Sequence, residues 1–119
     1  MRRCGDLGWI GLLLGSAMAA LAASPEADGF RRLSGTEIRS ALINRRFSDE
    51  THFAFRYERN GRVSGRSMGR DVTSTWRIEK DELCVTANQL RETCYRVWKK
   101  GPALRLVFGS DATIEGEVH

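Results

Sequence analysis

The sequence predicts a mainly β protein, an antiparallel meander of six or seven short strands that forms a small barrel or half-barrel with one N-terminal α-helix. Two observations predict this class. Apolar and polar residues alternate with period two in several segments after residue 47, and turn-forming residues separate those segments. Strands with one apolar face must close on themselves or be covered, which favours a barrel. A two-layer β-sandwich is the alternative architecture.

The first segment, residues 1–22, has the pattern of a secretory signal peptide. Two arginines precede an uncharged apolar run, and small residues occupy both positions that signal peptidase recognises before a cut after Ala22. We expect a periplasmic or secreted protein whose mature chain has no transmembrane segment. Residues 23–32 are predicted to be a flexible mature N-terminus, and residues 33–119 a single β domain.

One helix is predicted over residues 35–45. Ser34 and Glu37 form an S-x-x-E capping box, in which each residue satisfies a backbone N–H group at the start of the helix. Leu33 and Ile38 can pack together across that cap as a hydrophobic staple. The helix is short, so it needs packing against the rest of the domain to be stable.

A strand with one aromatic face follows, because Phe53, Phe55 and Tyr57 alternate with more polar residues. Residues 59–62 then carry a hairpin signal. A two-residue loop would place an arginine on the aromatic face. A three-residue loop with a left-handed glycine instead pairs Tyr57 with Val63 and keeps that face apolar, so we predict the longer loop.

The rest of the meander is built from four further turns. Pairing Ile78 with Leu83 across the turn at residues 80–81 also pairs Trp76 with Val85, so all four side chains face the core. Trp76 is therefore predicted to be a core residue. The later strands are expected near residues 72–78, 83–85, 93–99, 104–108 and 114–118.

The cysteines predict one disulfide bond. Removal of the signal peptide also removes Cys4, which leaves Cys84 and Cys94 in the mature chain. An even number of cysteines in an oxidising compartment is typical of a disulfide. There is no C-x-x-C motif, and neither His52 nor His119 has the spacing of a metal ligand relative to the cysteines. No metal or other cofactor is expected.

The composition and motifs argue for binding and against catalysis. The chain has no G-x-S-x-G or S-x-x-K motif, so we expect no enzymatic activity. Its net charge of +4 is too small to indicate a nucleic-acid partner. The predicted function is a non-enzymatic domain, inhibitor-like in character, that binds a protein partner or an envelope component. The alternative is a carrier with a small apolar ligand in the barrel mouth.

Two groups of residues are candidate binding sites. Arg96 and Trp98 are predicted to lie outside the barrel beside the disulfide, where a tryptophan next to an arginine is typical of an interface. The alternative is that Trp98 covers the disulfide or packs on the helix. The other group is a cluster of arginines that can form a patch for an anion or a partner, or can protect an edge strand by charge. This predicted arginine patch comprises Arg56, Arg59, Arg62, Arg66 and Arg70.

Several short motifs together resemble a group of small exported proteins from Gram-negative bacteria that have no assigned function. The resemblance covers residues 33–118 and implies a β scaffold with one disulfide and no catalytic residues. The order of tryptophan and cysteine is also similar to that of the small β-barrel inhibitors of secreted metalloproteases, although the second half of the pattern differs. The motifs are LSGTEIR at 33–39, NGRVSG at 60–65, TWRI at 75–78, LC at 83–84 and CYRV at 94–97.

Export with cleavage after Ala22 can be tested by the intact mass of the protein recovered from the periplasm or the medium of an expressing bacterium. We expect the mass of residues 23–119, because the small residues before the cut fit signal peptidase. Replacing Ala22 with Leu should block processing at this site and serves as the control. An exported species that still carries residues 1–22 would contradict the prediction.

Overall fold

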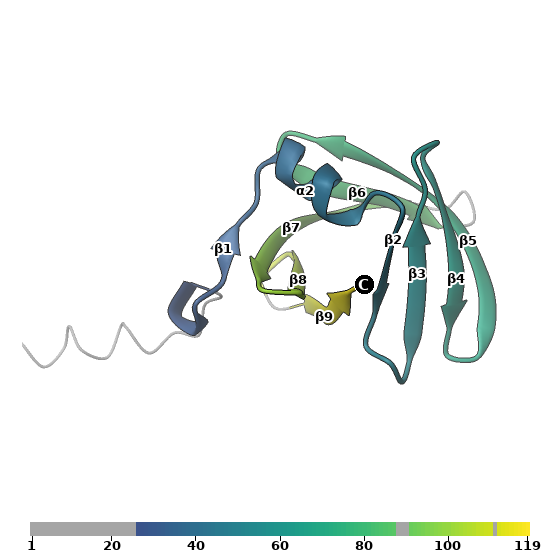
Figure 1. Cartoon of the computed structure of the whole chain (residues 1–119). Coiled ribbons are helices and arrows are strands. Elements are labelled where there is room, and N and C mark those ends of the chain that lie inside the picture. Colours follow the sequence, from purple (N-terminus) through teal and green to yellow (C-terminus); the bar gives the residue numbers. More distant parts are fainter. Residues whose placement is uncertain (1–25, 88–90, 111) are drawn as a thin grey trace, which may run out of the picture.

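The computed structural model describes residues 26–87, 91–110 and 112–119. Eight antiparallel strands form a closed barrel, with a short additional strand along its side and one α-helix at one end (Figure 1). The predicted barrel with an N-terminal helix is therefore confirmed, with slightly more strands than expected, and no two-layer sandwich is formed. The predicted signal peptide lies outside the described residues. Within those residues, no helix has the length and apolar character needed to cross a membrane.

Each barrel strand pairs with its neighbours in the chain, and the first barrel strand also pairs with the last, which closes the sheet. The additional strand, β1, pairs with the end of β7. The start of β7 pairs with β6 on the same side. The elements are η1 (Glu26–Asp28), β1 (Arg31–Arg32), α2 (Gly35–Leu42), β2 (Arg45–Ser48), β3 (Phe53–Tyr57), β4 (Arg62–Ser67), β5 (Arg70–Glu79), β6 (Glu82–Ala87), β7 (Glu92–Lys100), β8 (Ala103–Phe108) and β9 (Ala112–Val118).

The helix begins as predicted and ends earlier. The Ser34 hydroxyl accepts a hydrogen bond from the Glu37 N–H, and the Glu37 carboxylate accepts one from the Ser34 N–H, which completes the capping box. The helix stops at Leu42 and not at residue 45, because Asn44 adopts a positive φ of 59° and its N–H donates to the carbonyl of Tyr57. Asparagine tolerates this left-handed conformation better than most residues. The chain therefore enters β2 at Arg45.

Two strands were not expected from the sequence. Arg45, predicted to end the helix, instead begins β2. Arg31 and Arg32, which belong to the segment predicted to be flexible, form β1 and pair with Lys99 and Trp98 of β7. Both strands are short and rich in arginine, so they lack the alternation that identifies a strand in a sequence.

The hairpin registers agree with the predictions. Tyr57 pairs with Val63 across the β3–β4 loop, where Gly61 has a φ of 93°. Gly65 lies inside β4, directly opposite Phe55 of β3. A Cβ atom at Gly65 would lie 2.0 Å from the carbonyl oxygen of Ala54, so the close approach of β3 and β4 requires a glycine at this position. Beyond the next turn, Trp76 pairs with Val85 as expected.

The predicted disulfide is present on the outside of the barrel. Cys84 of β6 and Cys94 of β7 are directly opposite each other, with an S–S distance of 2.06 Å. In this register Leu83 pairs with Tyr95. Val97 follows two positions later on the same face of β7 and is a fully buried core residue. The disulfide thus joins two strands that are already paired, and stabilises the fold by restricting the unfolded chain.

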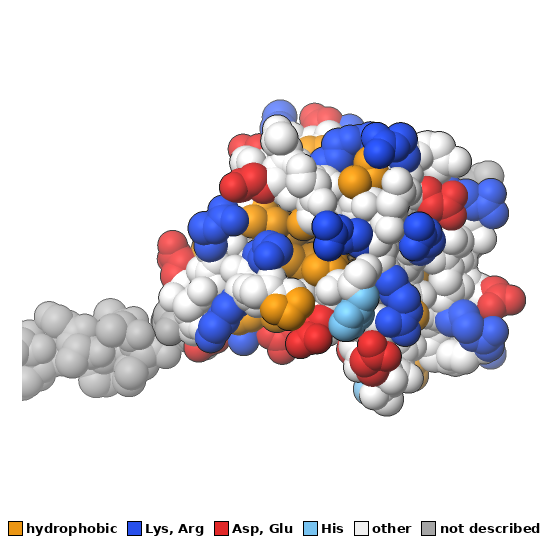
Figure 2. Space-filling model, viewed as in Figure 1, with side chains coloured by type: hydrophobic (Ala, Val, Ile, Leu, Met, Phe, Trp, Pro, Cys, Tyr) orange, Lys and Arg blue, Asp and Glu red, His pale blue; other side chains and the backbone are white. Residues whose placement is uncertain are grey.

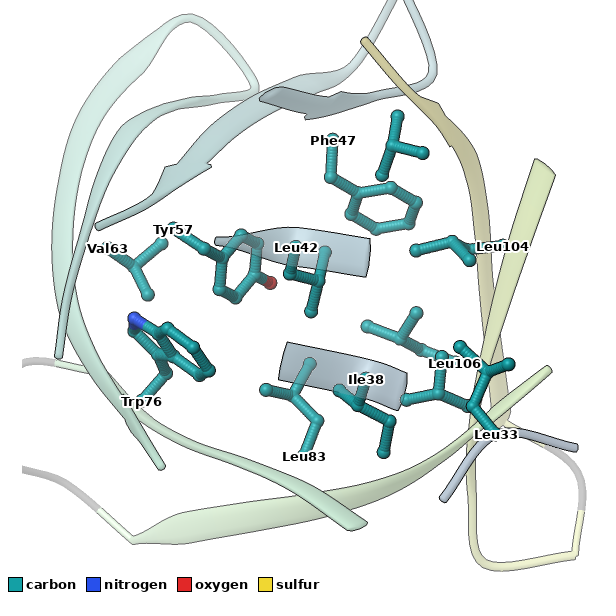
Figure 3. Close-up of a cluster of buried hydrophobic side chains, with 12 residues drawn as sticks. Leu33, Ile38, Leu42, Phe47, Tyr57, Val63, Trp76, Leu83, Leu104 and Leu106 are labelled. Atoms are coloured by element: carbon teal, nitrogen blue, oxygen red, sulfur yellow. The ribbon is translucent and has the colours of Figure 1, made fainter. Parts of the chain in front are cut away.

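The helix fills one end of the barrel with apolar side chains. Ile38 and Leu42 have no exposed surface and point from α2 into the barrel (Figure 3). Trp76 packs edge-on against Tyr57 and donates a hydrogen bond from its indole N–H to the carbonyl of Glu58 at 2.8 Å. The core consists of Leu33, Ile38, Leu42, Phe47, Tyr57, Val63, Trp76, Leu83, Val97, Leu104, Leu106 and Val118.

Replacing Trp76 with alanine should destabilise the domain by about 3–5 kcal/mol, because it leaves a cavity in the core and removes one of the two N–H groups that donate to the Glu58 carbonyl. This is a large part of the total stability expected for such a domain, about 5–10 kcal/mol. Trp98→Ala, on the outer face, is the matched control and should cost less. Chemical denaturation monitored by circular dichroism measures both. A Trp76→Ala variant as stable as the Trp98→Ala variant would show that the core assignment is wrong.

Candidate functional site

The end of the barrel beside α2 holds an open groove of about 520 Å³. The helix packs against β2, β5 and β6 and leaves the part of the mouth next to β7, β8 and β9 uncovered. In Figure 2 apolar side chains are visible on this face, surrounded by those of Lys and Arg. We call this feature the helix-end groove. It is lined by Arg31, Leu33, Thr36, Glu37, Ser40, Ala41, Arg45, Lys99, Gly101, Pro102 and Val118.

The strand registers explain why basic residues surround the groove. Arg31 pairs with Lys99, Lys99 pairs with the core residue Leu104, and Arg45 pairs with the core residue Tyr57. On its own strand, each of the three basic residues therefore occupies the interior-facing position nearest the barrel mouth. At this position the interior face meets water. Alternation along a strand places the residue two positions further in on the same face. Those residues are Leu33, Val97 and Phe47, all buried in the core.

Among the described residues that line the groove, Glu37 supplies the carboxylate, and this carboxylate already has hydrogen-bond and ion-pair partners. It accepts a hydrogen bond from the Ser34 N–H at 2.8 Å and forms an ion pair with Arg31 at 2.9 Å. The Ser34 N–H and, to a smaller extent, Arg31 hold the pKa of Glu37 below its usual value. Glu37 is thus ionised at neutral pH and compensates the charge of Arg31.

The other two cations of the groove are not compensated in this way. Among the described residues, neither Arg45 nor Lys99 takes part in an ion pair within 4.0 Å. The Lys99 ammonium donates one hydrogen bond to the carbonyl of Gly101, which leaves two of its three donors for another acceptor. The groove therefore combines an apolar floor with two cations that can bind an anion.

All five members of the predicted arginine patch are exposed, on β3, the β3–β4 turn, β4 and the start of β5. Arg56 pairs with Ser64, so it shares the outer face of the sheet with Arg62 and Arg66, which lie two positions to either side of Ser64. Arg66 pairs with Asp71 at 3.1 Å. Protection of an edge does not explain the patch, because β3 and β4 each have a neighbour on both sides. Arg56 even lies directly opposite Arg46 of β2, and such a pair of like charges is unfavourable.

Trp98 and Arg96 lie on the outer face of β7, as the predicted facing requires. Both are half-buried, and the guanidinium of Arg96 donates a hydrogen bond to the carbonyl of Gly109 in the β8–β9 turn. Trp98 pairs with Arg32 of β1, a strand that the sequence did not reveal. Neither residue lines the helix-end groove. Their role as an interface stays a prediction.

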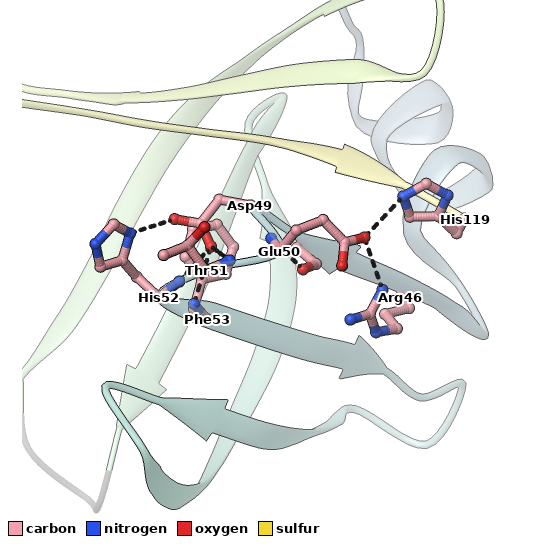
Figure 4. Close-up of polar contacts among 8 residues, drawn as sticks. Arg46, Asp49, Glu50, Thr51, His52, Phe53 and His119 are labelled. Atoms are coloured by element: carbon pink, nitrogen blue, oxygen red, sulfur yellow. Dashed lines mark hydrogen bonds and ion pairs between the residues drawn. The ribbon is translucent and has the colours of Figure 1, made fainter.

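The loop between β2 and β3 contains a histidine–carboxylate pair at the other end of the barrel. His52 Nδ1 lies 2.8 Å from the Asp49 carboxylate, whose other oxygen accepts hydrogen bonds from the N–H groups of residues 51–53 (Figure 4). The Ser48 hydroxyl is buried and accepts a hydrogen bond from the Glu50 N–H. No hydrogen bond joins Ser48 to His52 in the described part of the chain. The Asp49 carboxylate stabilises the loop through its bonds to residues 51–53.

No protein-family model, curated protein or solved structure matches this chain. Function therefore has to be inferred from the geometry and charge of the helix-end groove. Sequence reasoning missed the groove because its cations come from β1, β2 and β7, and two of these strands were not predicted. The capping-box residue Glu37 and the staple residue Leu33 were the sequence signals at this site.

Replacing Asp49 with asparagine should destabilise the domain in a pH-dependent way. Partial burial opposes ionisation, but the N–H groups of residues 51–53 and the His52 ring outweigh it and hold the pKa of Asp49 well below its usual value. The stabilisation is therefore complete above the unfolded-state pKa of about 4 and is lost as the pH falls through the lower pKa of the folded state.

Thermal melts of wild type and Asp49→Asn between pH 7 and pH 2 test this. We expect the melting temperatures to differ most at neutral pH and to converge in acid. Asp71→Asn is the control, because Asp71 is exposed and accepts a hydrogen bond from one arginine. A melting-temperature difference for Asp49→Asn that does not change with pH would contradict the assignment.

Proposed function

We propose that this protein is an exported, non-enzymatic binding domain that attaches to an anionic lipid surface of the cell envelope through the helix-end groove and the basic side chains around it. The observation that carries the proposal is the groove, in which an apolar floor adjoins the uncompensated cations Arg45 and Lys99. Export is supported by the signal-like residues 1–22 and by the Cys84–Cys94 disulfide, since disulfides persist in oxidising compartments.

The side chains of the groove suit binding better than catalysis. Its ionisable groups are the cations and Glu37, and Glu37 is engaged by Ser34 and Arg31. The Arg45 guanidinium offers hydrogen-bond donors and no acceptor, which suits it to hold an anion. The histidines His52 and His119 do not line the groove.

The basic surface continues from the groove across the helix. The guanidinium of Arg39 lies over the Trp76 ring, 5.3 Å from its centre, on a face of α2 outside the groove. Trp76 forms hydrogen bonds with both ends of the β3–β4 turn. Its indole N–H donates to the carbonyl of Glu58, and its backbone N–H donates to the carbonyl of Gly61. This turn carries Arg59, and Arg62 follows it. Two members of the predicted arginine patch thus extend the same surface.

The alternative function, a carrier with an apolar ligand inside the barrel mouth, has less support. A carrier needs an empty interior. Here the helix inserts Ile38 and Leu42 into the barrel, and Leu83 of β6 and Leu104 of β8 are equally buried (Figure 3). The space available for a ligand at this end is the groove beside α2, which is open to solvent and lined by charged residues at its rim.

Co-sedimentation with vesicles tests the proposal. Wild type should bind phosphatidylglycerol vesicles and not phosphatidylcholine vesicles, and the binding should weaken as salt rises through about 0.15 M, where the screening length is about 8 Å. The double variant Arg45→Glu/Lys99→Glu should bind at least tenfold more weakly, because each basic residue near an anionic surface contributes about 1 kcal/mol and reversal adds repulsion. Its melting temperature should stay within a few degrees of wild type, since both side chains lie at the rim.

Two further variants locate the site. Arg66→Glu, at a position whose charge Asp71 already compensates, is the matched control and should bind nearly as wild type does. Arg59→Glu/Arg62→Glu tests the predicted arginine patch and should weaken binding, because both residues extend the basic surface. Wild type that fails to bind phosphatidylglycerol at low salt would overturn the proposal. Full binding by Arg45→Glu/Lys99→Glu would exclude the groove as the site.

A further inference from the structure

We infer that the helix-end groove takes one anionic single-chain amphiphile, with the acyl chain along its apolar floor and the charged head between Arg45 and Lys99. This inference rests on the proposed function, because it names the ligand that the same groove holds. It also goes further, since a basic surface can attach to a membrane without binding any single lipid molecule.

The floor is suited to an acyl chain. Four apolar residues from four different elements meet there: Leu33 after β1, Ala41 of α2, Pro102 of the β7–β8 turn and Val118 of β9. Leu33 and Val118 are core residues, 1% and 8% exposed, so the apolar surface open to a ligand comes mainly from the half-buried Ala41 and the exposed Pro102. Covering Ala41 and Pro102 would remove apolar surface from water, which favours binding of a hydrocarbon chain.

The size of the groove favours a small ligand. Its volume of about 520 Å³ lies in the range of sites that hold drug-sized molecules. A molecule with one acyl chain of moderate length belongs to this class. Glu37 compensates the charge of Arg31 at 2.9 Å, so the cations left for one head group are Arg45 of β2 and Lys99 of β7.

The rim toward β2 and β7 determines the charge of the head. Arg45 is exposed and presents a planar fork of donors, which binds carboxylates and phosphates with two parallel hydrogen bonds. Lys99 keeps two ammonium donors beyond its bond to Gly101. A neutral head would leave both cations without a counter-charge, and a cationic head would be repelled. A phosphate or carboxylate head is therefore the matching chemistry.

Isothermal titration below the micelle concentration tests the inference with defined probes. Dodecyl phosphate should bind with a stoichiometry of one. Dodecyltrimethylammonium, which has the same tail and the opposite charge, should bind at least tenfold more weakly, and inorganic phosphate, which has no tail, should not bind measurably. Equal affinity for the two amphiphiles, or a stoichiometry well above one, would overturn the inference.

Variants separate the roles of the floor and the rim. Arg45→Gln/Lys99→Gln should weaken dodecyl phosphate binding at least tenfold, and Ala41→Gln should weaken it by placing a larger polar side chain on the floor. Arg66→Gln is the matched control for charge and should leave the affinity unchanged. Because Ala41 is half-buried, its variant is compared with wild type by thermal melting first. If Ala41→Gln does not fold, the rim variant decides, and full affinity in that variant would overturn the inference.

Comparison with the vesicle experiment separates this inference from the proposed function. Binding to phosphatidylglycerol vesicles without binding of dodecyl phosphate would overturn the single-chain site and leave the proposed attachment to an anionic surface intact. Binding of dodecyl phosphate without binding to vesicles would support the site and overturn the proposed attachment to a lipid surface.

Discussion

The closure of the barrel between β2 and β9 is the constraint on which the rest of the structure depends. The contact is short: Phe47 pairs with Val118, and Ser48 pairs with Glu117. It is possible because Gly116 lets the backbones approach, since a Cβ atom at that position would lie 2.7 Å from the Ser48 carbonyl oxygen. Closure removes the free edges of the sheet and leaves two open ends, one of which α2 occupies.

The candidate site is a consequence of the way in which the helix occupies that end. A helix of eight residues inserts two fully buried side chains into the barrel, but it is too short to cover the mouth completely. The uncovered part is bounded by β7, β8 and β9, and its rim consists of the final interior positions of β1, β2 and β7. Such positions face apolar atoms on one side and water on the other. Long basic side chains suit them, because their stems are apolar and their ends are charged.

Most basic side chains in the described part of the chain have no carboxylate within 4.0 Å, and the arginines that do are Arg31, Arg46, Arg66, Arg77 and Arg105. Arg77 forms ion pairs with Glu92 and Glu79, which raise its pKa further and lower that of Glu92. Exposed pairs of this kind contribute little to stability. Arg45 and Lys99, without a carboxylate within 4.0 Å among the described residues, stand beside apolar atoms. The proposed site depends on this combination of unpaired charges and an apolar floor in one groove.

The sequence alone determined the local features: the capping box at Ser34, the register that pairs Tyr57 with Val63, the disulfide and the core position of Trp76. Each depends on residues close together in the chain, whose spacing and alternation carry the information. The groove was decided only by the tertiary structure. Arg31, Arg45 and Lys99 are far apart in the sequence, and in isolation each is an ordinary surface cation. The pairing of β1 with β7 and of β2 with β9 brings them to one barrel mouth, because closing a sheet joins its most distant strands, which no local pattern encodes.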